Sequence, residues 1–220
     1  MDGADRADGR HADEGSVRAH ALRWFREYLC REHPLLGRAG DVCPFVEPAL
    51  HAGTLLLRVR RMEGPATASR LVHLVHDLVR SFREAEWPHR NRTLHALVAV
   101  LPDLPEEQLR LLDEVQAAVK PELAEDGLML GQFHARCPEP AARNPEFPVS
   151  RAPVPMLALR HMALHDILFL HDDVRTFTAY RDRFGHRYRP GVALDPLFVE
   201  LFTAARRRFT GPVPAPAPAG

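Results

Sequence analysis

The histidines and the acid that follow residue 160 are the side chains whose types and spacing most directly suggest chemistry. His161 and His165 lie four residues apart, and Asp166 follows them. On a helix this spacing places two imidazoles on one face, which is a metal-ligand arrangement. If residues 154–160 form a strand, His161 ends that strand and the helical argument fails. One histidine is then buried and one exposed, or an imidazole at the strand end binds a haem, with Asp166 orienting it.

A second group of candidate residues lies in a proline-rich stretch after Gly131. Long irregular loops are uncommon in compact domains and are often functional when present. The polar side chains of this stretch include His134, Arg136, Cys137, Arg143 and Arg151. Arginines with few acids nearby can bind the carboxylates of a substrate or of a haem. The alternative is that these arginines are solvated and that the prolines only fix the loop.

The cysteines supply one further candidate residue, and their spacing excludes some classes of site. Cys43, at a junction of loop and strand before Pro44, is either a thiolate ligand or nucleophile, or a small buried apolar residue. Cys30, Cys43 and Cys137 are widely spaced and include no C-x-x-C pair. A disulfide framework is therefore disfavoured, and a zinc ribbon or a thioredoxin-type pair is excluded.

Other catalytic classes are poorly supported. Lys120 is the only lysine, no Walker-type phosphate loop is present, and no serine lies in a G-x-S-x-G motif. The chain carries several acids between residues 103 and 114, namely Asp103, Glu106, Glu107, Asp113 and Glu114. We interpret these acids as a solvated helix face and not as a paired-carboxylate site.

The elements that must position these residues follow from the hydrophobic periodicity. Strands are predicted at residues 54–59, 93–101, 128–134 and 154–160, and helices at 16–31, 67–87, 105–120, 163–170, 174–184 and 196–209. Ser16 is the predicted N-cap of the first helix. Residues 93–101 are apolar on both faces and should be central. The order predicts an α+β fold, with about four strands covered by helices and a helical C-terminal third.

The amino-acid composition limits the domain organisation of the protein and the partners that it can bind. A formal net charge of zero without a basic run argues against nucleic acid. No apolar run reaches the ~20 residues that a membrane span needs, so we expect a cytoplasmic protein. We predict a disordered leader at 1–15, one α+β domain at 16–210 and a disordered Pro/Ala tail at 211–220. A homodimer is a further hypothesis, because a four-stranded sheet covered on one face often buries its other face against a second copy.

Four segments together resemble an uncharacterised bacterial domain family. They are CPFV at 43–46, GLMLGQFHARCP at 127–138, the stretch at 144–166, and ILFL at 167–170. The family hallmark is close to RSPVPxLAIRHM followed by an aspartate, and here Ala152 replaces the serine. The resemblance covers residues 33–185. It implies a gene neighbourhood of specialised-metabolite biosynthesis, and it implies no established activity.

Cys43-Pro44-Phe45 and the β-α-β-α order also resemble the YqcI/YcgG family. Some members of that family are haem-dependent N-hydroxylases of guanidine or amine groups, so this resemblance implies haem. The leading hypothesis is a haem-dependent oxidase or oxygenase that acts on a small amine or amino-acid-like metabolite. Its candidate catalytic residues are Arg160, Asp166 and His134. Its candidate cofactor-binding residues are His161, His165, Arg143, Arg151 and Cys43.

Two other hypotheses stay open. One is a non-haem-metal or cofactor-free biosynthetic enzyme that uses His134, His161, His165 and Asp166, with His161 and His165 as the metal ligands. The other is a non-catalytic accessory protein of a biosynthetic pathway.

Overall fold

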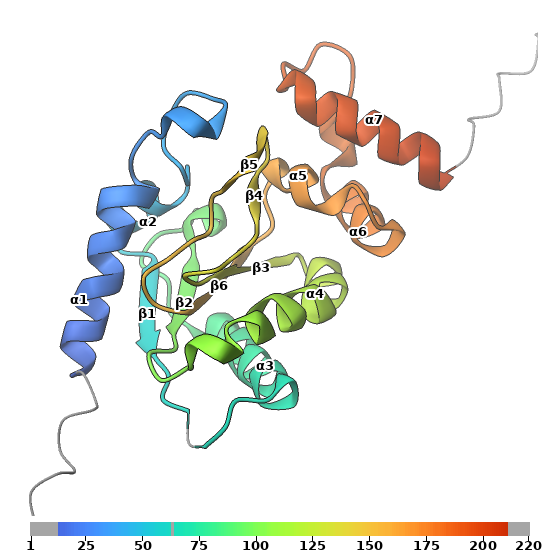
Figure 1. The fold of residues 1–220 in the computed structure, drawn as a ribbon. Coiled ribbons are helices and arrows are strands. Elements are labelled where there is room, and N and C mark those ends of the chain that lie inside the picture. Colours follow the sequence, from blue (N-terminus) through green and yellow to red (C-terminus); the bar gives the residue numbers. More distant parts are fainter. Residues whose placement is uncertain (1–12, 63, 211–220) are drawn as a thin grey trace, which may run out of the picture. The chain divides into compact units, whose positions relative to one another are not determined.

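The four predicted strands form a single mixed sheet in the computed structural model, which describes residues 13–62 and 64–210 (Figure 1). The strands are β1 (Leu55–Val59), β2 (Ala96–Val100), β3 (Leu128–Phe133) and β6 (Met156–His161), in the order β1-β2-β6-β3. β1 and β2 are parallel, whereas β2 and β6 are antiparallel with Val98 opposite Ala158. The predicted α+β class with a four-stranded sheet is confirmed, and β2 is an inner strand as its apolar sequence predicts.

The described chain divides into two compact units. The first contains the chain up to Gln116 together with Leu130–Arg160, and the second contains Ala117–Met129 and the chain from His161 onward. The predicted single domain at 16–210 stays a prediction. The predicted tail at 211–220, and the predicted leader up to residue 12, lie outside the described residues.

Helices cover both faces of the sheet in the first unit. Helix α1 (Glu14–Trp24) packs Val17 and Ala21 against Val98 and Val100 of β2. Because side chains alternate along a strand, the buried Leu97 and Ala99 face the other side. Helix α3 (Ala68–Glu84) contacts β2 there, and the two helices lie on opposite sides of the sheet (Figure 1). Helices thus lie on both faces of this sheet, and the homodimer stays a prediction.

The N-terminal helix begins earlier than predicted. Asp13, and not Ser16, is the N-cap, because its carboxylate accepts a hydrogen bond from the Ser16 amide at 3.3 Å. The helix continues as a π-helix, η1 (Phe25–Leu29). A 3-10 turn, η2 (Pro34–Leu36), and a short helix, α2 (Val46–His51), follow in a segment that was predicted to be loop.

Helix α3 has Thr67 as its N-cap and ends at Glu84, close to the predicted bounds. Two 3-10 turns, η3 (Arg92–Leu94) and η4 (Glu106–Gln108), follow later in the chain. Helix α4 (Arg110–Glu125) continues through Pro121 instead of ending at Lys120. Proline removes one backbone donor from a helix, and α4 extends past that position all the same.

The predicted loop between β3 and β6 contains a small hairpin of β4 (Pro140–Ala141) and β5 (Asn144–Pro148). The Tyr28 hydroxyl donates to the Val149 carbonyl at 2.9 Å, which ties the hairpin to η1. The Asn144 amide donates to the Leu35 carbonyl at 2.8 Å. These bonds hold a proline-rich segment in one place without making it part of the main sheet.

The second unit is helical, as predicted for the C-terminal third. It contains η5 (Leu164–Asp166), α5 (Ile167–Leu170), α6 (Val174–Phe184), η6 (Gly185–Arg187) and α7 (Pro196–Thr210). Its core is aromatic: Phe177 and Tyr180 are fully buried and pack with Phe202. Among the helices of residues 13–62 and 64–210, none combines the length and the apolar character that crossing a membrane requires.

Candidate metal centre

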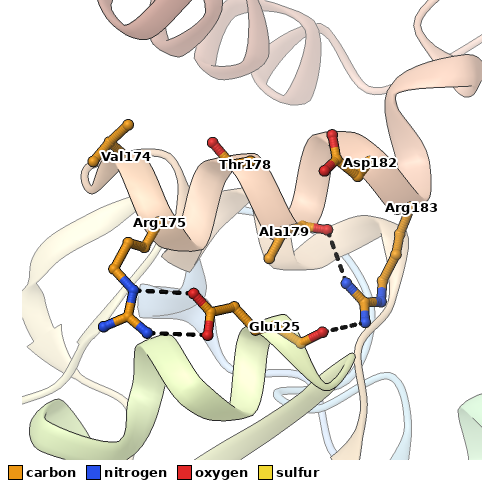
Figure 2. A pocket seen from close by; sticks show the side chains of 7 residues that line it. All are labelled: Glu125, Val174, Arg175, Thr178, Ala179, Asp182 and Arg183. Carbon is orange, nitrogen blue, oxygen red and sulfur yellow. Dashed lines mark hydrogen bonds and ion pairs between the residues drawn. The ribbon is translucent and has the colours of Figure 1, made fainter.

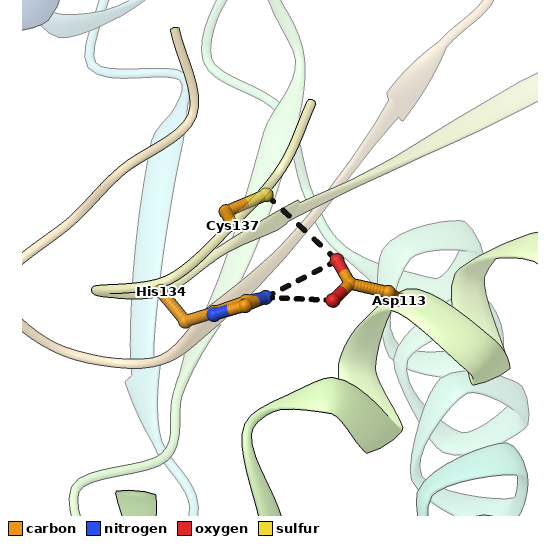
Figure 3. A group of neighbouring side chains, drawn as sticks. All are labelled: Asp113, His134 and Cys137. Carbon is orange, nitrogen blue, oxygen red and sulfur yellow. Dashed lines mark hydrogen bonds and ion pairs between the residues drawn. The ribbon is translucent and has the colours of Figure 1, made fainter. Parts of the chain in front are cut away.

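Three chemically active side chains meet in the first unit, at the end of β3. They are Asp113, His134 and Cys137 (Figure 3). Their ligand atoms all lie within 4.8 Å of one another. In the described part of the chain, this is the one group of three or more His, Cys, Asp and Glu side chains at metal-binding separations.

A tight turn brings two of these residues together. His134 follows the last residue of β3, and its carbonyl accepts a hydrogen bond from the Cys137 amide at 3.1 Å. The same carbonyl accepts from the Ala152 amide at 3.2 Å, which joins the start of the loop to its end. The H-x-x-C spacing therefore places the imidazole and the thiol on one turn.

Helix α4 supplies the carboxylate from its first turn. Asp113 shares the helix face of the buried Leu109 and Leu112, so its side chain points inward. Gln116, one turn later, donates to the Leu130 carbonyl of β3 at 3.2 Å. Helix and strand are thus fixed side by side, and the carboxylate lies against the end of the strand.

The Asp113 carboxylate is the common hydrogen-bond partner of the neighbouring polar side chains. The Nε2 atom of His134 lies 3.1 Å from each carboxylate oxygen. Nε2 donates to this carboxylate in the ring tautomer that carries its proton there. The Gln132 amide and the Cys137 thiol are also donors to Asp113 Oδ1, at 3.3 Å and 3.8 Å. One carboxylate therefore accepts bonds from three side chains.

Burial distinguishes the three residues. His134 is 1% exposed and Cys137 is 0% exposed, whereas 22% of the Asp113 side chain is exposed. The Nδ1 atom of His134 is buried and has no hydrogen-bond partner among the described residues. Burial, together with the nearby carboxylates of Asp113 and Glu139, raises the pKa of the Cys137 thiol to about 12. Without a metal, this sulfur is a neutral thiol at physiological pH.

Of the candidates predicted from the sequence, only His134 belongs to this group. Cys137 was named only as part of the loop, and Asp113 was assigned to a solvated face. That interpretation of Asp113 is wrong, because its carboxylate holds three buried donors. Arg136 lies on the turn, but it pairs with Glu106 at 3.0 Å instead of standing free for a substrate.

The other first-unit candidates lie elsewhere. Cys43 is half-buried, and burial raises its pKa although the nearby Arg160 guanidinium lowers it. The Arg160 guanidinium stacks over the Phe45 ring at 4.6 Å. Arg143 is exposed at the tip of the hairpin, and Arg151 is exposed beside the backbone bridge to His134.

The second-unit candidates lie around η5. His161 is the last residue of β6 and His165 lies in η5, so the two are not one turn apart on a helix. His165 is exposed and packs edge-on against Phe198. Asp166 is buried, and its carboxylate accepts from the Ala163 amide at 2.7 Å. This bond caps η5, a structural contact that the sequence interpretation did not include.

A surface depression of about 320 Å³ also lies in the second unit, between α6 and the end of α4 (Figure 2). Two of its charged residues already pair with each other: Arg175 donates two hydrogen bonds to Glu125, each at 3.0 Å. The bonded guanidinium holds the pKa of Glu125 below its usual range. None of the candidates His161, His165 and Asp166 lines it.

The fold and the site thus define an α+β protein with a buried Asp-His-Cys group. Residues 18–195 match a domain of unknown function, DUF6875, and the chain belongs to this family. The expected uncharacterised domain family is confirmed at that level, and the match adds no support for the arginine-histidine motif or for the YqcI/YcgG resemblance. No curated protein and no solved structure matches the chain.

Proposed function

We propose that this protein is a non-haem metalloprotein that binds one transition metal ion of the zinc type through Asp113, His134 and Cys137, and uses it in a reaction of a small metabolite. The observation that carries the proposal is the convergence of a sulfur, an imidazole nitrogen and a carboxylate within 4.8 Å. Thiolate and imidazole donors favour zinc and its neighbours, whereas magnesium and calcium prefer oxygen donors alone.

Two of the three separations lie near those around a tetrahedral ion. Zinc bonds of ~2.0–2.3 Å place neighbouring ligand atoms roughly 3.4–3.6 Å apart at tetrahedral angles. His134 Nε2 lies 3.1 Å from the Asp113 oxygens, and Cys137 Sγ lies 3.8 Å from Oδ1. The two pairs that include Asp113 are therefore within a few tenths of an ångström of this spacing, and the Nε2 and Sγ atoms lie within 4.8 Å of each other.

The number of ligands supports a reactive site over a purely structural one. Structural zinc sites are closed by four protein ligands, whereas catalytic sites have three and keep one position for water or substrate. Asp113 is the most exposed of the three side chains, so the open position is expected on its side. A metal there can lower the pKa of a bound water or polarise a substrate carbonyl.

Metal analysis of the purified full chain tests the proposal. Protein expressed with added Zn²⁺ and purified without chelators should contain about one equivalent of zinc. His134→Gln and Cys137→Ser should each lower the bound metal at least about tenfold. Replacement by Co²⁺ should add a thiolate-to-cobalt absorption band that Cys137→Ser removes.

Two matched variants control for unspecific binding. Cys30→Ser removes a half-buried thiol elsewhere, and His171→Gln removes a histidine paired with Asp172 at 3.0 Å on the surface. Both should retain the metal of the parent protein. Metal below about a tenth of an equivalent in the parent, or equal content in all variants, contradicts the proposal.

A cofactor-free acid-base role of His134 is the second candidate. Asp113 fixes the proton on Nε2, which leaves Nδ1 as a basic lone pair with no partner among the described residues. Nitrogen-15 NMR of the histidine rings distinguishes the two candidates. Addition of Zn²⁺ moves the His134 proton from Nε2 to Nδ1 if the metal binds there, and it leaves the ring unchanged in the acid-base case.

The haem-dependent oxidase inferred from the YqcI/YcgG resemblance stays a separate prediction. The described surroundings of His165, an exposed ring packed edge-on against Phe198, do not resemble a buried axial ligand site. We therefore derive no step through haem. Titration of the purified protein with haemin tests that prediction, and the absence of a Soret shift counts against it.

A further inference from the structure

A second pair of thiols lies in the first unit, outside the Asp-His-Cys group. Cys30 follows the π-helix η1, and Cys43 lies three residues before α2. Both are free cysteines, and both are partly exposed. The proposed metal centre does not use either of them.

Backbone hydrogen bonds place these two residues on facing segments. Glu32 and Asp41 form an antiparallel bridge, and the Val42 amide donates to the Arg31 carbonyl at 2.8 Å. Beyond this isolated bridge the chain leaves the extended conformation, and Cys30 lies in a turn with φ −93° and ψ 28°. The Cys43 amide in fact bonds to the carbonyl of Leu29, the neighbour of Cys30, at 2.9 Å.

This bond holds the backbones of Cys30 and Cys43 next to each other, and a disulfide requires such proximity of the two backbones. The two thiols also interact electrostatically, since charge on Cys43 raises the pKa of Cys30. Rotation of the two side chains, with adjustment of the adjoining turn, can therefore bring the sulfurs together.

We propose that Cys30 and Cys43 are a redox modification site that closes to an intramolecular disulfide in the presence of a small-molecule disulfide. The thiolate of Cys30 attacks one sulfur of the small disulfide and forms a mixed disulfide with it, and the other sulfur leaves as one thiol. The thiolate of Cys43 then attacks the Cys30 sulfur and displaces the second thiol. Two protein thiols are oxidised to one disulfide, and the small disulfide is reduced to two thiols.

The surroundings set the rate of this reaction. Burial, with Glu47 and Asp41 beside it, raises the pKa of Cys30 to about 11, and Arg31 opposes this shift. Burial also raises the pKa of Cys43, against the lowering effect of the guanidinium groups of Arg160 and Arg38. Both sulfurs are thiols at neutral pH. Closure should be slow there and should accelerate about tenfold per pH unit up to about pH 10, in proportion to the thiolate fraction.

Peptide mapping of the oxidised full chain tests the proposal. The protein is incubated with oxidised glutathione at about pH 9, alkylated, and digested with trypsin without reductant. Cleavage after Arg26, Arg31, Arg38 and Arg58 should release residues 27–31 linked to residues 39–58. Reductant should separate the two peptides. The melting temperature should rise by roughly 5–10 °C on oxidation.

Variants assign the bond and separate this proposal from the metal centre. Cys30→Ser and Cys43→Ser should each abolish the linked peptide, whereas Cys137→Ser should retain it and lose the metal. Recovery of both peptides unlinked after prolonged oxidation overturns the proposal. A bond to Cys137, or to a second copy of the chain, overturns it as well.

Discussion

The Asp113 carboxylate is the residue on which the local structure of the site depends. It accepts hydrogen bonds from the His134 imidazole, the Gln132 amide and the Cys137 thiol. His134, Gln132 and Cys137 are all buried, so these donors rely on acceptors within the protein. A buried donor that loses its acceptor costs the free energy of its desolvation.

Asp113→Ala should therefore destabilise the metal-free protein by roughly 2–4 kcal/mol, because several buried donors lose their acceptor at once. Glu114→Ala is the matched control, since that neighbouring acid is exposed and pairs with Arg110 on the surface. It should change the free energy of unfolding by less than about 0.5 kcal/mol. Urea denaturation of both variants measures the difference, and equal effects contradict the assigned role.

The raised pKa of the Cys137 thiol determines how the affinity for a metal ion should depend on pH. Its pKa is raised to about 12 by burial and by the nearby carboxylates, so metal binding must displace its proton. Affinity for Zn²⁺ should rise about tenfold per pH unit between about pH 6 and 8. Competition with a chromophoric chelator measures this slope. A pH-independent affinity means that Cys137 is not a ligand.

At the scale of single residues, the sequence predicted one of the three residues of the candidate metal centre. His134 was named because it lies in a loop of unusual composition after a strand. Asp113 was missed because four other acids between residues 103 and 114 suggested a solvated face. Its position in the helix repeat with Leu109 and Leu112 was the available signal. The H-x-x-C spacing after a strand was the corresponding signal for Cys137.

At the scale of elements, hydrophobic periodicity was sufficient for the strands and the long helices. The strand positions and α6 agree with the prediction because their apolar side chains fill a core. Short elements were missed where local signals conflict. Pro48 obscured α2, Pro121 suggested a false end for α4, and the hairpin strands begin and end at prolines. The π-helix η1 has no signature in the hydrophobic pattern.

Helix α3 gives a quantitative test of this argument. Leu78 is fully buried, whereas Leu74 on the same helix is only half-buried. Leu78→Ala should cost roughly 2–5 kcal/mol of unfolding free energy through lost burial and a residual cavity, and Leu74→Ala roughly half as much. Chemical denaturation compares them. Equal losses would show that the two positions are packed alike.

At the scale of the whole molecule, the raised thiol pKa couples stability to alkaline pH. Folding shifts the pKa of Cys137 upward from its ordinary value of 9.0 to about 12. The folded state therefore holds this proton while the unfolded state releases it. The resulting stabilisation is complete below about pH 9 and is lost as the pH rises toward 12.

The slope of unfolding free energy against pH should be about 1.4 kcal/mol per unit steeper in the parent than in Cys137→Ala between about pH 9.5 and 11. The tyrosines and Cys30 titrate in both proteins, so the difference isolates Cys137. Identical slopes in the metal-free proteins contradict the buried, neutral thiol.

The most direct test of the metal centre is anomalous X-ray scattering from a crystal of the zinc-loaded protein at the zinc absorption edge. We predict a single strong peak about 2.3 Å from Cys137 Sγ and about 2.0 Å from His134 Nε2, with an Asp113 oxygen at a similar distance. A peak elsewhere on the chain contradicts the account. Electron density that shows these side chains still hydrogen-bonded to one another, with no peak among them, contradicts it as well.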